Sequence, residues 1–391
     1  MRCEDAAEWQ ESILREVNTL LANDTFEIVS KNTVPQGRKI VKSKWVFKNK
    51  KDKSGTLLSH KTHLVAKGFT EIPGVDYFEI FHPVGQGQTF RLLVAKSAKQ
   101  GRKLYHVDIK GAFLHATLDE EIYLELPKGT GLGEGNNPVI VKLKKSLYGL
   151  KQAGRDWFLA LSAVLRDIGF QQSPVDPCLL WHPRHDTYVM VYVDDLLISV
   201  QEEKSFKWFV SEVSKKFEVG SAEPAQWYLG IRINQQGGVI TLDQRAGVED
   251  LIHKYGMQDC NTVTTPAVPN SKLEQAKPGE PETHHPYRSL VGALLFLSVH
   301  TRPDIQYAVN ELTKHCEHPT ERHWESAKRV LRYLQGTLDY QLCYRASADM
   351  TLHAACDADW ACNWKGQGAD AKSITGYVCW IAGGVVSAKA K

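Results

Sequence analysis

The stretch from Tyr188 to Val200 limits most strongly what this chain can fold into. Two runs of β-branched and aromatic residues flank Asp194 and Asp195, a pattern that predicts a tight β-hairpin with the two acids at its tip. Asn-Gly or Asp-Gly would suit such a turn better, because those pairs readily adopt the positive φ angles that short hairpins need. Two neighbouring carboxylates on a rigid hairpin favour an oxygen site for Mg²⁺, an ion that binds carboxylates together with substrate phosphates. A solvated acidic turn is the alternative.

A second strand-like run, from Leu104 to Ile109, contains a third acid, Asp108, near its end. Phosphoryl transfer by two metal ions needs carboxylates from more than one strand, because these side chains must bridge ions about 3.5–4 Å apart. Asp108 is therefore the candidate third ligand beside Asp194 and Asp195. The alternative is that Asp108 caps the turn that follows it.

Charge is distributed unevenly along the chain, although the net charge of the 391 residues is only +3. Between Arg38 and Lys67, ten lysines and arginines stand against the single acid Asp52, so this segment carries +9 and the rest of the chain −6. Apolar and basic residues alternate over 40–47 and 62–69, which predicts a basic two-stranded ribbon. Such a ribbon suits the binding of a polyanion, and a solvated basic hairpin is the alternative.

The composition is that of a globular protein, with 42% hydrophobic and 24% charged residues, and the length suits two or three domains. We expect no membrane segment, because the longest apolar run, Leu290 to Val299, is too short to span a bilayer and the N-terminus shows no signal-peptide pattern. The eight cysteines have no Cys-x-x-Cys spacing, so we expect them to be reduced and structural.

Ordered motifs occur along the chain from Glu8 to its last residue. They are Lys44 to Lys48, Leu64 to Phe69, Asp108 with Phe113, Ser146 to Gln152, Tyr192 to Asp195, Tyr228 to Ile231, Thr301 to Asp304, Leu331 to Thr337 and Asp357 to Ala361. Together they resemble the reverse transcriptase region of the Pol polyprotein of copia-type LTR retrotransposons. The resemblance implies an RNA-directed DNA polymerase, a nucleotidyltransferase that extends a DNA primer on an RNA template with deoxynucleoside triphosphates. It also implies Mg²⁺, or alternatively Mn²⁺, as cofactor. The implied location is the cytoplasm, in a virus-like particle for a complete element, or alternatively the nucleus.

The resemblance assigns roles to three groups of residues. The catalytic residues are Asp108, Asp194 and Asp195, and the metal ligands are these three with Ile109. The nucleotide-binding residues are Phe113, Tyr148, Gly149, Lys61 and Lys67. The nucleic-acid-binding residues are Lys44, Lys48, Lys151, Gln152 and Arg155. The ring of Phe113 would exclude a ribose 2′-hydroxyl; without the resemblance, Phe113 is interpreted as a core aromatic residue.

Two positions depart from the family pattern. His63 and Gln86 each stand where copia-type enzymes usually have arginine. Both changes remove a cation near the expected substrate path, because glutamine is uncharged and histidine is mostly neutral near a pH of about 7. They leave two alternatives to an active polymerase, namely a nucleic-acid-binding remnant that has lost turnover and a host-adopted interaction protein.

By resemblance, the fold class is α/β (α+β), a right-hand polymerase fold with fingers, palm and thumb, followed by a connection region and a truncated RNase H-like domain. Five prolines over 264–286 indicate an exposed linker. The expected divisions are an N-terminal helix over 1–24, fingers, palm and thumb over 25–265, the linker over 266–286, connection helices over 287–345 and a partial RNase H-like domain over 346–391.

The C-terminal region resembles the start of an RNase H fold, with Asp357 on its first acidic strand. RNase H chemistry needs several carboxylates around two metal ions. In copia-type enzymes the next carboxylate comes from a Thr-Glu-Ala-Glu segment downstream of the strand that follows Trp380, and no such segment occurs before Lys391. We therefore expect Asp357 to be a remnant and expect no hydrolysis of the RNA strand of an RNA–DNA hybrid.

Overall fold

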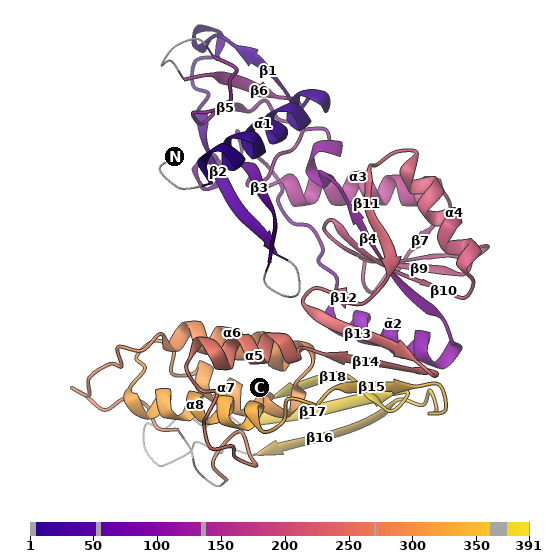
Figure 1. Cartoon of the computed structure of the whole chain (residues 1–391), viewed down its shortest axis with the longest axis vertical. Helices are drawn as coiled ribbons and strands as arrows, with labels where there is room; N and C mark the ends of the chain where they lie inside the picture. Colours follow the sequence, from indigo (N-terminus) through magenta and orange to yellow (C-terminus); the bar gives the residue numbers. More distant parts are fainter. Residues whose placement is uncertain are drawn as a thin grey trace.

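The predicted hairpin lies at the centre of a six-stranded antiparallel sheet (Figure 1). The structure, a computed structural model, describes residues 5–51, 56–133, 138–269, 271, 273–359 and 374–390. The strand order is β11-β4-β10-β9-β8-β7, and the strands span Lys103–Ile109 (β4), Gln171–Gln172 (β7), Leu179–His182 (β8), Thr187–Tyr192 (β9), Asp195–Val200 (β10) and Val219–Pro224 (β11). The central strands are rich in β-branched and aromatic residues, which pack well on a pleated surface.

The hairpin is confirmed, but its tip lies one residue earlier than the sequence predicts. Tyr192 and Asp195 are paired partners of β9 and β10, so Val193 and Asp194 form the two-residue turn. Val193 has a φ of +57°, a left-handed conformation that is rare for a β-branched residue. The placement of both acids at the tip is therefore wrong, because the pairing of Tyr192 with Asp195 makes Asp195 the first residue of a strand.

Side chains alternate between the two faces of this sheet, as its period of two residues requires. One face packs in a hydrophobic core against α3 (Ala153–Asp167) and α4 (Glu203–Ser214). The other face carries Leu104 and Leu197 and packs against α2 (Gly87–Gln100). A four-stranded antiparallel sheet belongs to the same core as α2, with strands Trp227–Tyr228 (β12), Ile231–Gln236 (β13), Val239–Asp243 (β14) and Leu342–Arg345 (β15).

The N-terminal region forms a five-stranded sheet beside α1 (Ala6–Ala22) (Figure 1). Its order is β1-β6-β5-β2-β3, and the strands span Phe26–Val29 (β1), Ile40–Lys51 (β2), Leu57–Ala66 (β3), Tyr123–Glu125 (β5) and Ile140–Leu143 (β6). The predicted N-terminal helix is confirmed, and it buries Ile13 and Val17 at helical spacing. The predicted basic ribbon is also confirmed as β2 and β3, in which Lys48 pairs with Lys61 so that both side chains lie on one face.

Four helices share a separate hydrophobic core in the lower part of Figure 1. They are α5 (Arg245–Lys254), α6 (Tyr287–His300), α7 (Gln306–Thr313) and α8 (Glu321–Gln335). Thr320 begins a capping box at the start of α8. The segment over 266–286 contacts this core, because Ala267 and Leu273 pack against it. Arg322 of α8 also binds the carboxylate of Glu280 through two hydrogen bonds. One core therefore includes helices on both sides of the predicted linker, and the domain boundaries stay predictions.

The last strands form a three-stranded antiparallel sheet that contacts α2 and β15. They are β16 (His353–Asp359), β17 (Ile374–Ile381) and β18 (Gly384–Ala390). Short 3₁₀ turns occur at Lys31–Thr33 (η1), Gly68–Thr70 (η2), Ala112–His115 (η3) and Pro303–Ile305 (η4). The mixture of helices and sheets agrees with the predicted α/β class, whereas the division into fingers, palm, thumb, connection and RNase H-like domain stays a prediction. Within the described residues, no helix combines the length and apolar composition needed to cross a bilayer.

Candidate active site

Three carboxylates meet at one end of the neighbouring strands β4 and β10 of the six-stranded sheet. Asp108, near the end of β4, is the direct cross-strand partner of Asp195, the first residue of β10. Asp194 lies in the adjoining turn, and its carbonyl accepts a hydrogen bond from the backbone N–H of Ile109 at 3.1 Å. The predicted convergence of carboxylates from two strands is thus present in the structure.

The turn that carries Asp194 is held by a buried tryptophan. Trp157 of α3 donates a hydrogen bond from Nε1 to the carbonyl of Val193 at 2.7 Å. Left-handed backbone at a β-branched residue costs about 1–3 kcal/mol and persists only where the surroundings fix it. The contact with Trp157 is one such constraint, so the fold maintains an unfavourable turn where two acids lie close together.

The electrostatics of the three carboxylates favour a cation. Burial raises the pKa of Asp194, and the negative charges of Asp195 and Asp108 raise this pKa further. The charge of Lys61 on β3 acts in the opposite direction. Because ionised Asp194 is poorly solvated and faces like charges, a positive ion at this place would relieve both effects.

Asp195 has a side-chain partner within the fold. Its Oδ1 lies 2.8 Å from Nε2 of His106, and this hydrogen bond is the main cause that raises the pKa of His106. His106 lies two residues before Asp108 and hence on the same face of β4. His106 is not among the predicted site residues, although its spacing from Asp108 is a signal that could have identified it.

Gly220 on β11 is a second residue that the sequence analysis missed. β11 has a register shift between Val219 and Ala222 where it pairs with β4. A Cβ placed on Gly220 would collide with Oδ2 of Asp108. Glycine inside a strand often marks a bulge or a close approach of another group, and here it leaves room for the Asp108 carboxylate.

The donor set fits Mg²⁺, although its ligands are not gathered into a closed cage. Across the described ranges, no group of three or more His, Cys, Asp and Glu side chains forms a ready metal site. Mg²⁺ commonly takes only one or two carboxylates and completes its shell with water and substrate phosphates. Asp108 and Asp194 can supply those two carboxylates, while Asp195 is bound to His106. The side chain of Ile109 is a buried hydrocarbon without a ligand atom, so only its backbone carbonyl could serve as the predicted metal ligand.

The predicted nucleotide-binding residues Tyr148 and Phe113 contact each other beside the acids. Their rings meet edge to face with centroids 4.7 Å apart, and the centroid of the Tyr148 ring also lies 4.9 Å from that of His63. Burial raises the pKa of Tyr148, with further contributions from Asp194 and Asp108. The aromatic pair therefore lies between the basic ribbon and the carboxylates.

Gly149 joins this aromatic pair to the end of β3. Its φ is +92°, and a Cβ at this position would collide with the carbonyl of Ala66 and lie 2.7 Å from Cγ1 of Val65. The two backbone segments therefore approach each other closely here, which only glycine allows. The side chains of Lys44, Lys48 and Lys61 are exposed on the ribbon, and Lys67 at its end is half-buried.

The other predicted nucleic-acid-binding residues have partners within the protein. Nζ of Lys151 donates to the hydroxyl of Tyr77 at 2.9 Å, and Nη2 of Arg155 binds a carboxylate oxygen of Glu79 at 2.8 Å. Gln152 is buried, and its Nε2 donates to a backbone carbonyl at 3.0 Å. Their contacts with nucleic acid stay predictions, and each would require an exchange of these partners.

The two departures from the family pattern are integrated into the fold. Nδ1 of His63 lies 3.3 Å from Oε1 of Glu16 on α1. The backbone N–H of Gln86, the residue before α2, donates to the carboxylate of Asp176 at 3.1 Å. Both positions therefore contribute to the structure irrespective of any contact with substrate.

Asp357 lies in a different sheet from the three carboxylates. It is exposed on β16, where it pairs with Gly376 of β17, and it lines a groove of about 480 Å³ beside α7. Two other acids follow Asp357 in the sequence, Asp359 and Asp370; the side chain of Asp359 and all of Asp370 lie outside the described residues. The expected absence of RNase H activity stays a prediction.

Comparisons with known proteins show what this chain is similar to. Residues 23–269 match the family described as reverse transcriptase (RNA-dependent DNA polymerase). The retrovirus-related Pol polyprotein from transposon RE2 of Arabidopsis thaliana is 34% identical over 95% of this chain, which spans 25% of that protein. A putative transposon Ty5-1 protein of Saccharomyces cerevisiae is 32% identical over 73% of this chain and 92% of its own length. A solved foamy viral protease–reverse transcriptase in complex with double-stranded DNA aligns over 97% of this chain and 55% of that chain, with a TM-score of 0.48 and 12% identity.

Proposed function

This chain belongs to the reverse transcriptase (RNA-dependent DNA polymerase) family, with Pol polyproteins of copia-type transposons among its relatives, and we propose that it catalyses RNA-directed DNA synthesis. The observation that carries the proposal is the meeting of Asp108, Asp194 and Asp195 at the end of β4 and β10. The substrates would be deoxynucleoside triphosphates, a DNA primer and an RNA template. The chain spans about a quarter of the RE2 polyprotein, so the other activities of such polyproteins are not part of this proposal.

In the proposed reaction, the primer 3′-oxygen forms a bond to the α-phosphorus while the bond from that phosphorus to the bridging oxygen breaks and pyrophosphate leaves. Asp108 and Asp194 would hold divalent metal ions, Mg²⁺ or alternatively Mn²⁺. When bound, such ions stabilise the attacking and leaving oxygens of an in-line displacement. The proton of the 3′-hydroxyl passes to solvent.

The protein groups around the carboxylates have complementary tasks. Lys61 and the neighbouring lysines of the ribbon would neutralise phosphate charge, as mobile ammonium groups do. Tyr148 and Phe113 would form the apolar side of the nucleotide site, with the Phe113 ring against the sugar. His106 would orient Asp195 through the hydrogen bond between them. Catalysis would then depend on positioning and electrostatics.

Primer extension on an RNA template, with Mg²⁺ or Mn²⁺, tests the proposal. The parent chain should extend the primer, while Asp108→Asn and Asp194→Asn should each abolish extension and retain binding to the template–primer duplex. Asp167→Asn, at the exposed end of α3, is the matched control and should behave like the parent. Binding without extension by the parent chain would reject the proposal and support a remnant that binds nucleic acid without turnover.

A further inference from the structure

Glu71 places a buried carboxyl group beside the turn formed by residues 148–151. The residue is only 4% exposed, and its Oε2 accepts a hydrogen bond from the backbone N–H of Lys151 at 3.0 Å. A Cβ on Gly68 would lie 2.7 Å from the same Oε2, so glycine at this position makes room for the carboxyl group. Glu71 thus lies between the end of β3 and the turn that carries Tyr148.

This turn is part of the proposed nucleotide site. The backbone N–H of Ala66 on β3 donates to the carbonyl of Tyr148 at 2.7 Å. The ring of Tyr148 contacts the ring of Phe113. A change at Glu71 therefore reaches the aromatic pair through the N–H of Lys151 and the backbone of the turn.

Two buried oxygens near this turn lack hydrogen-bond donors. They are Oε1 of Glu71 and Oε1 of Gln152, and neither has a donor within reach in the part of the chain that the structure describes. Nε2 of Gln152 is already bound to the carbonyl of Asp76. Buried acceptors without donors are unfavourable, and an ionised carboxylate is more so. A proton on Glu71 removes the buried charge and adds a donor.

The surroundings of Glu71 favour that proton. Burial is the main cause that raises the pKa of Glu71 to about 7, and the negative charges of Asp76 and Glu120 add to this shift. The hydrogen bond from the N–H of Lys151 and the positive charge of Lys151 oppose it. The carboxyl group is therefore neutral below this pH and ionised above it. The pKa of Glu71 is higher in the folded chain than in the unfolded chain. The contribution of Glu71 to the stability of the fold is therefore present at low pH and is lost as the pH rises through about 7.

We propose that Glu71 is a positioning residue whose neutral carboxyl group holds the turn over 148–151 in place for the incoming nucleotide, and whose ionisation loosens that turn. The kinetic consequence rests on the proposed polymerase function. The structural consequence does not, because the contacts of Glu71 with the turn exist without substrate.

Hydrogen–deuterium exchange of the amides over 146–152 tests the structural consequence in the full chain. After correction for intrinsic rates, exchange in the parent should be about tenfold faster at a pH of about 8.5 than at about 6. Glu71→Gln keeps an acceptor for the N–H of Lys151 but cannot ionise, so its exchange should be slow at both pH values. Glu27→Gln on β1, where the carboxylate is 50% exposed, is the matched control and should follow the parent. Equal exchange at both pH values in the parent, or pH dependence that persists in Glu71→Gln, would overturn the proposal.

Primer extension then distinguishes positioning from a general structural role. The KM for the deoxynucleotide should rise by about tenfold over the same pH range in the parent and stay constant in Glu71→Gln, with similar kcat for both proteins. A loss of kcat in Glu71→Gln with an unchanged KM profile would overturn the positioning role. If the parent chain does not extend the primer, the polymerase proposal fails, and the exchange experiment alone still decides the role of Glu71.

Discussion

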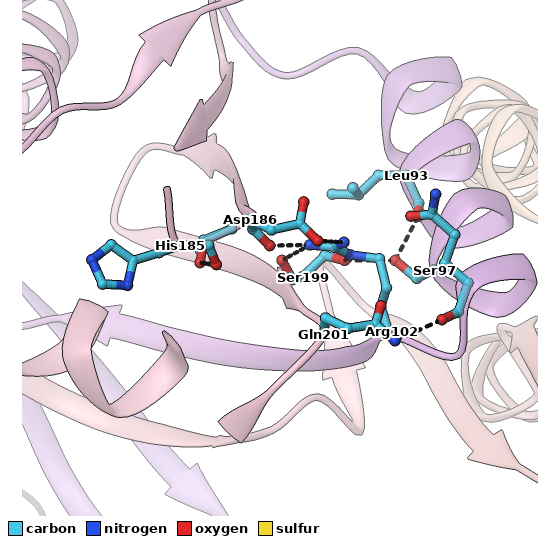
Figure 2. Close-up of polar contacts among 9 residues, drawn as sticks. Leu93, Ser97, Arg102, His185, Asp186, Ser199 and Gln201 are labelled. Carbon is cyan, nitrogen blue, oxygen red and sulfur yellow. Dashed lines mark hydrogen bonds and ion pairs between the residues drawn. The ribbon is translucent and has the colours of Figure 1, made fainter. Parts of the chain in front are cut away.

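Charged residues at the two ends of the six-stranded sheet have opposite surroundings. At the end described above, Asp108 and Asp194 lie close together, and burial and like charges raise the pKa of Asp194. At the other end, Arg102 is 4% exposed and donates hydrogen bonds to Asp186 and Ser199 (Figure 2). The guanidinium group also lies 5.0 Å from the ring centroid of Tyr188.

The difference separates groups that stabilise this fold from groups that are available for chemistry. Arg102 has its partners within the chain, and the hydroxyl of Ser199 also pairs with that of Ser97 on α2 at 2.8 Å (Figure 2). Asp194 instead lies near the charges of Asp195 and Asp108, which raise its pKa, while Lys61 acts in the opposite direction. Natural proteins have unfavourable charges and backbone conformations chiefly at functional sites, where a bound ligand can supply the missing favourable contacts. Variants at the two ends should therefore change different properties.

The largest effect is expected for Asp194→Asn. DNA synthesis should fall by on the order of a thousandfold or more, because several kcal/mol of transition-state stabilisation depend on this carboxylate. Folding should not suffer. Since the pKa of Asp194 is raised in the folded chain, its contribution to stability is present at low pH and is lost as the pH rises through that raised pKa.

The measurement is the free energy of unfolding against pH in metal-free buffer. In the parent, ionisation of Asp194 should lower the free energy of unfolding as the pH rises. This decrease should be absent in Asp194→Asn, which should be at least as stable as the parent at neutral pH. Strong destabilisation of this variant would show that Asp194 is a structural acid and would remove the contrast between the two ends.

Next in size is the effect of Arg102→Met on folding. The variant should lose about 2–4 kcal/mol of the free energy of unfolding, because buried oxygens of Ser199 and a carbonyl at Asp186 lose their donor. Denaturant unfolding measures the loss. Arg15→Met is the control. It removes a surface ion pair between Arg15 and Glu11, in which the two side chains are 60% and 70% exposed, and it should change stability by less than about 1 kcal/mol. Polymerase activity per folded molecule should stay that of the parent; a specific loss of activity would contradict the separation of roles.

Gly220→Ala should affect the catalytic end without unfolding it. The new methyl group would overlap Oδ2 of Asp108, and the flexible carboxylate can move away at little cost to the fold. A displacement of about 1 Å is enough to reduce kcat by about a hundredfold. Thermal unfolding with primer extension measures both properties, and Gly247→Ala, with open space around its Cβ, is the control. Parental activity in Gly220→Ala would mean that the position of Asp108 is not critical.

The smallest effect is expected for Phe113→Val. A smaller side chain beside Tyr148 opens space at the sugar, so incorporation of ribonucleotides relative to deoxynucleotides should rise about tenfold, or roughly 1.4 kcal/mol of discrimination. Competition between the two nucleotide types in one extension reaction gives this ratio directly. An unchanged ratio would place Phe113 in the core of the fold rather than in the sugar site.

Local patterns in the sequence determined which elements form. Alternating β-branched and aromatic residues around Asp194 fix a hairpin, and the helical spacing of Ile13 and Val17 fixes α1. Alternation of lysine with apolar residues likewise predicts the two strands of the basic ribbon. These features depend on neighbours within a few residues, so a single sequence is enough to predict them.

Only the tertiary structure decided register and partners. The pairing of Tyr192 with Asp195 moved the turn by one residue, and β15 joined β14 from about a hundred residues away in the chain. The hydrogen bond of His106 to Asp195, the space at Gly220 and the burial of Glu71 have the same origin. Such contacts depend on which surfaces pack together over long separations in sequence, and residue type at one position does not encode that choice, because the same histidine, glycine or glutamate fits many local environments.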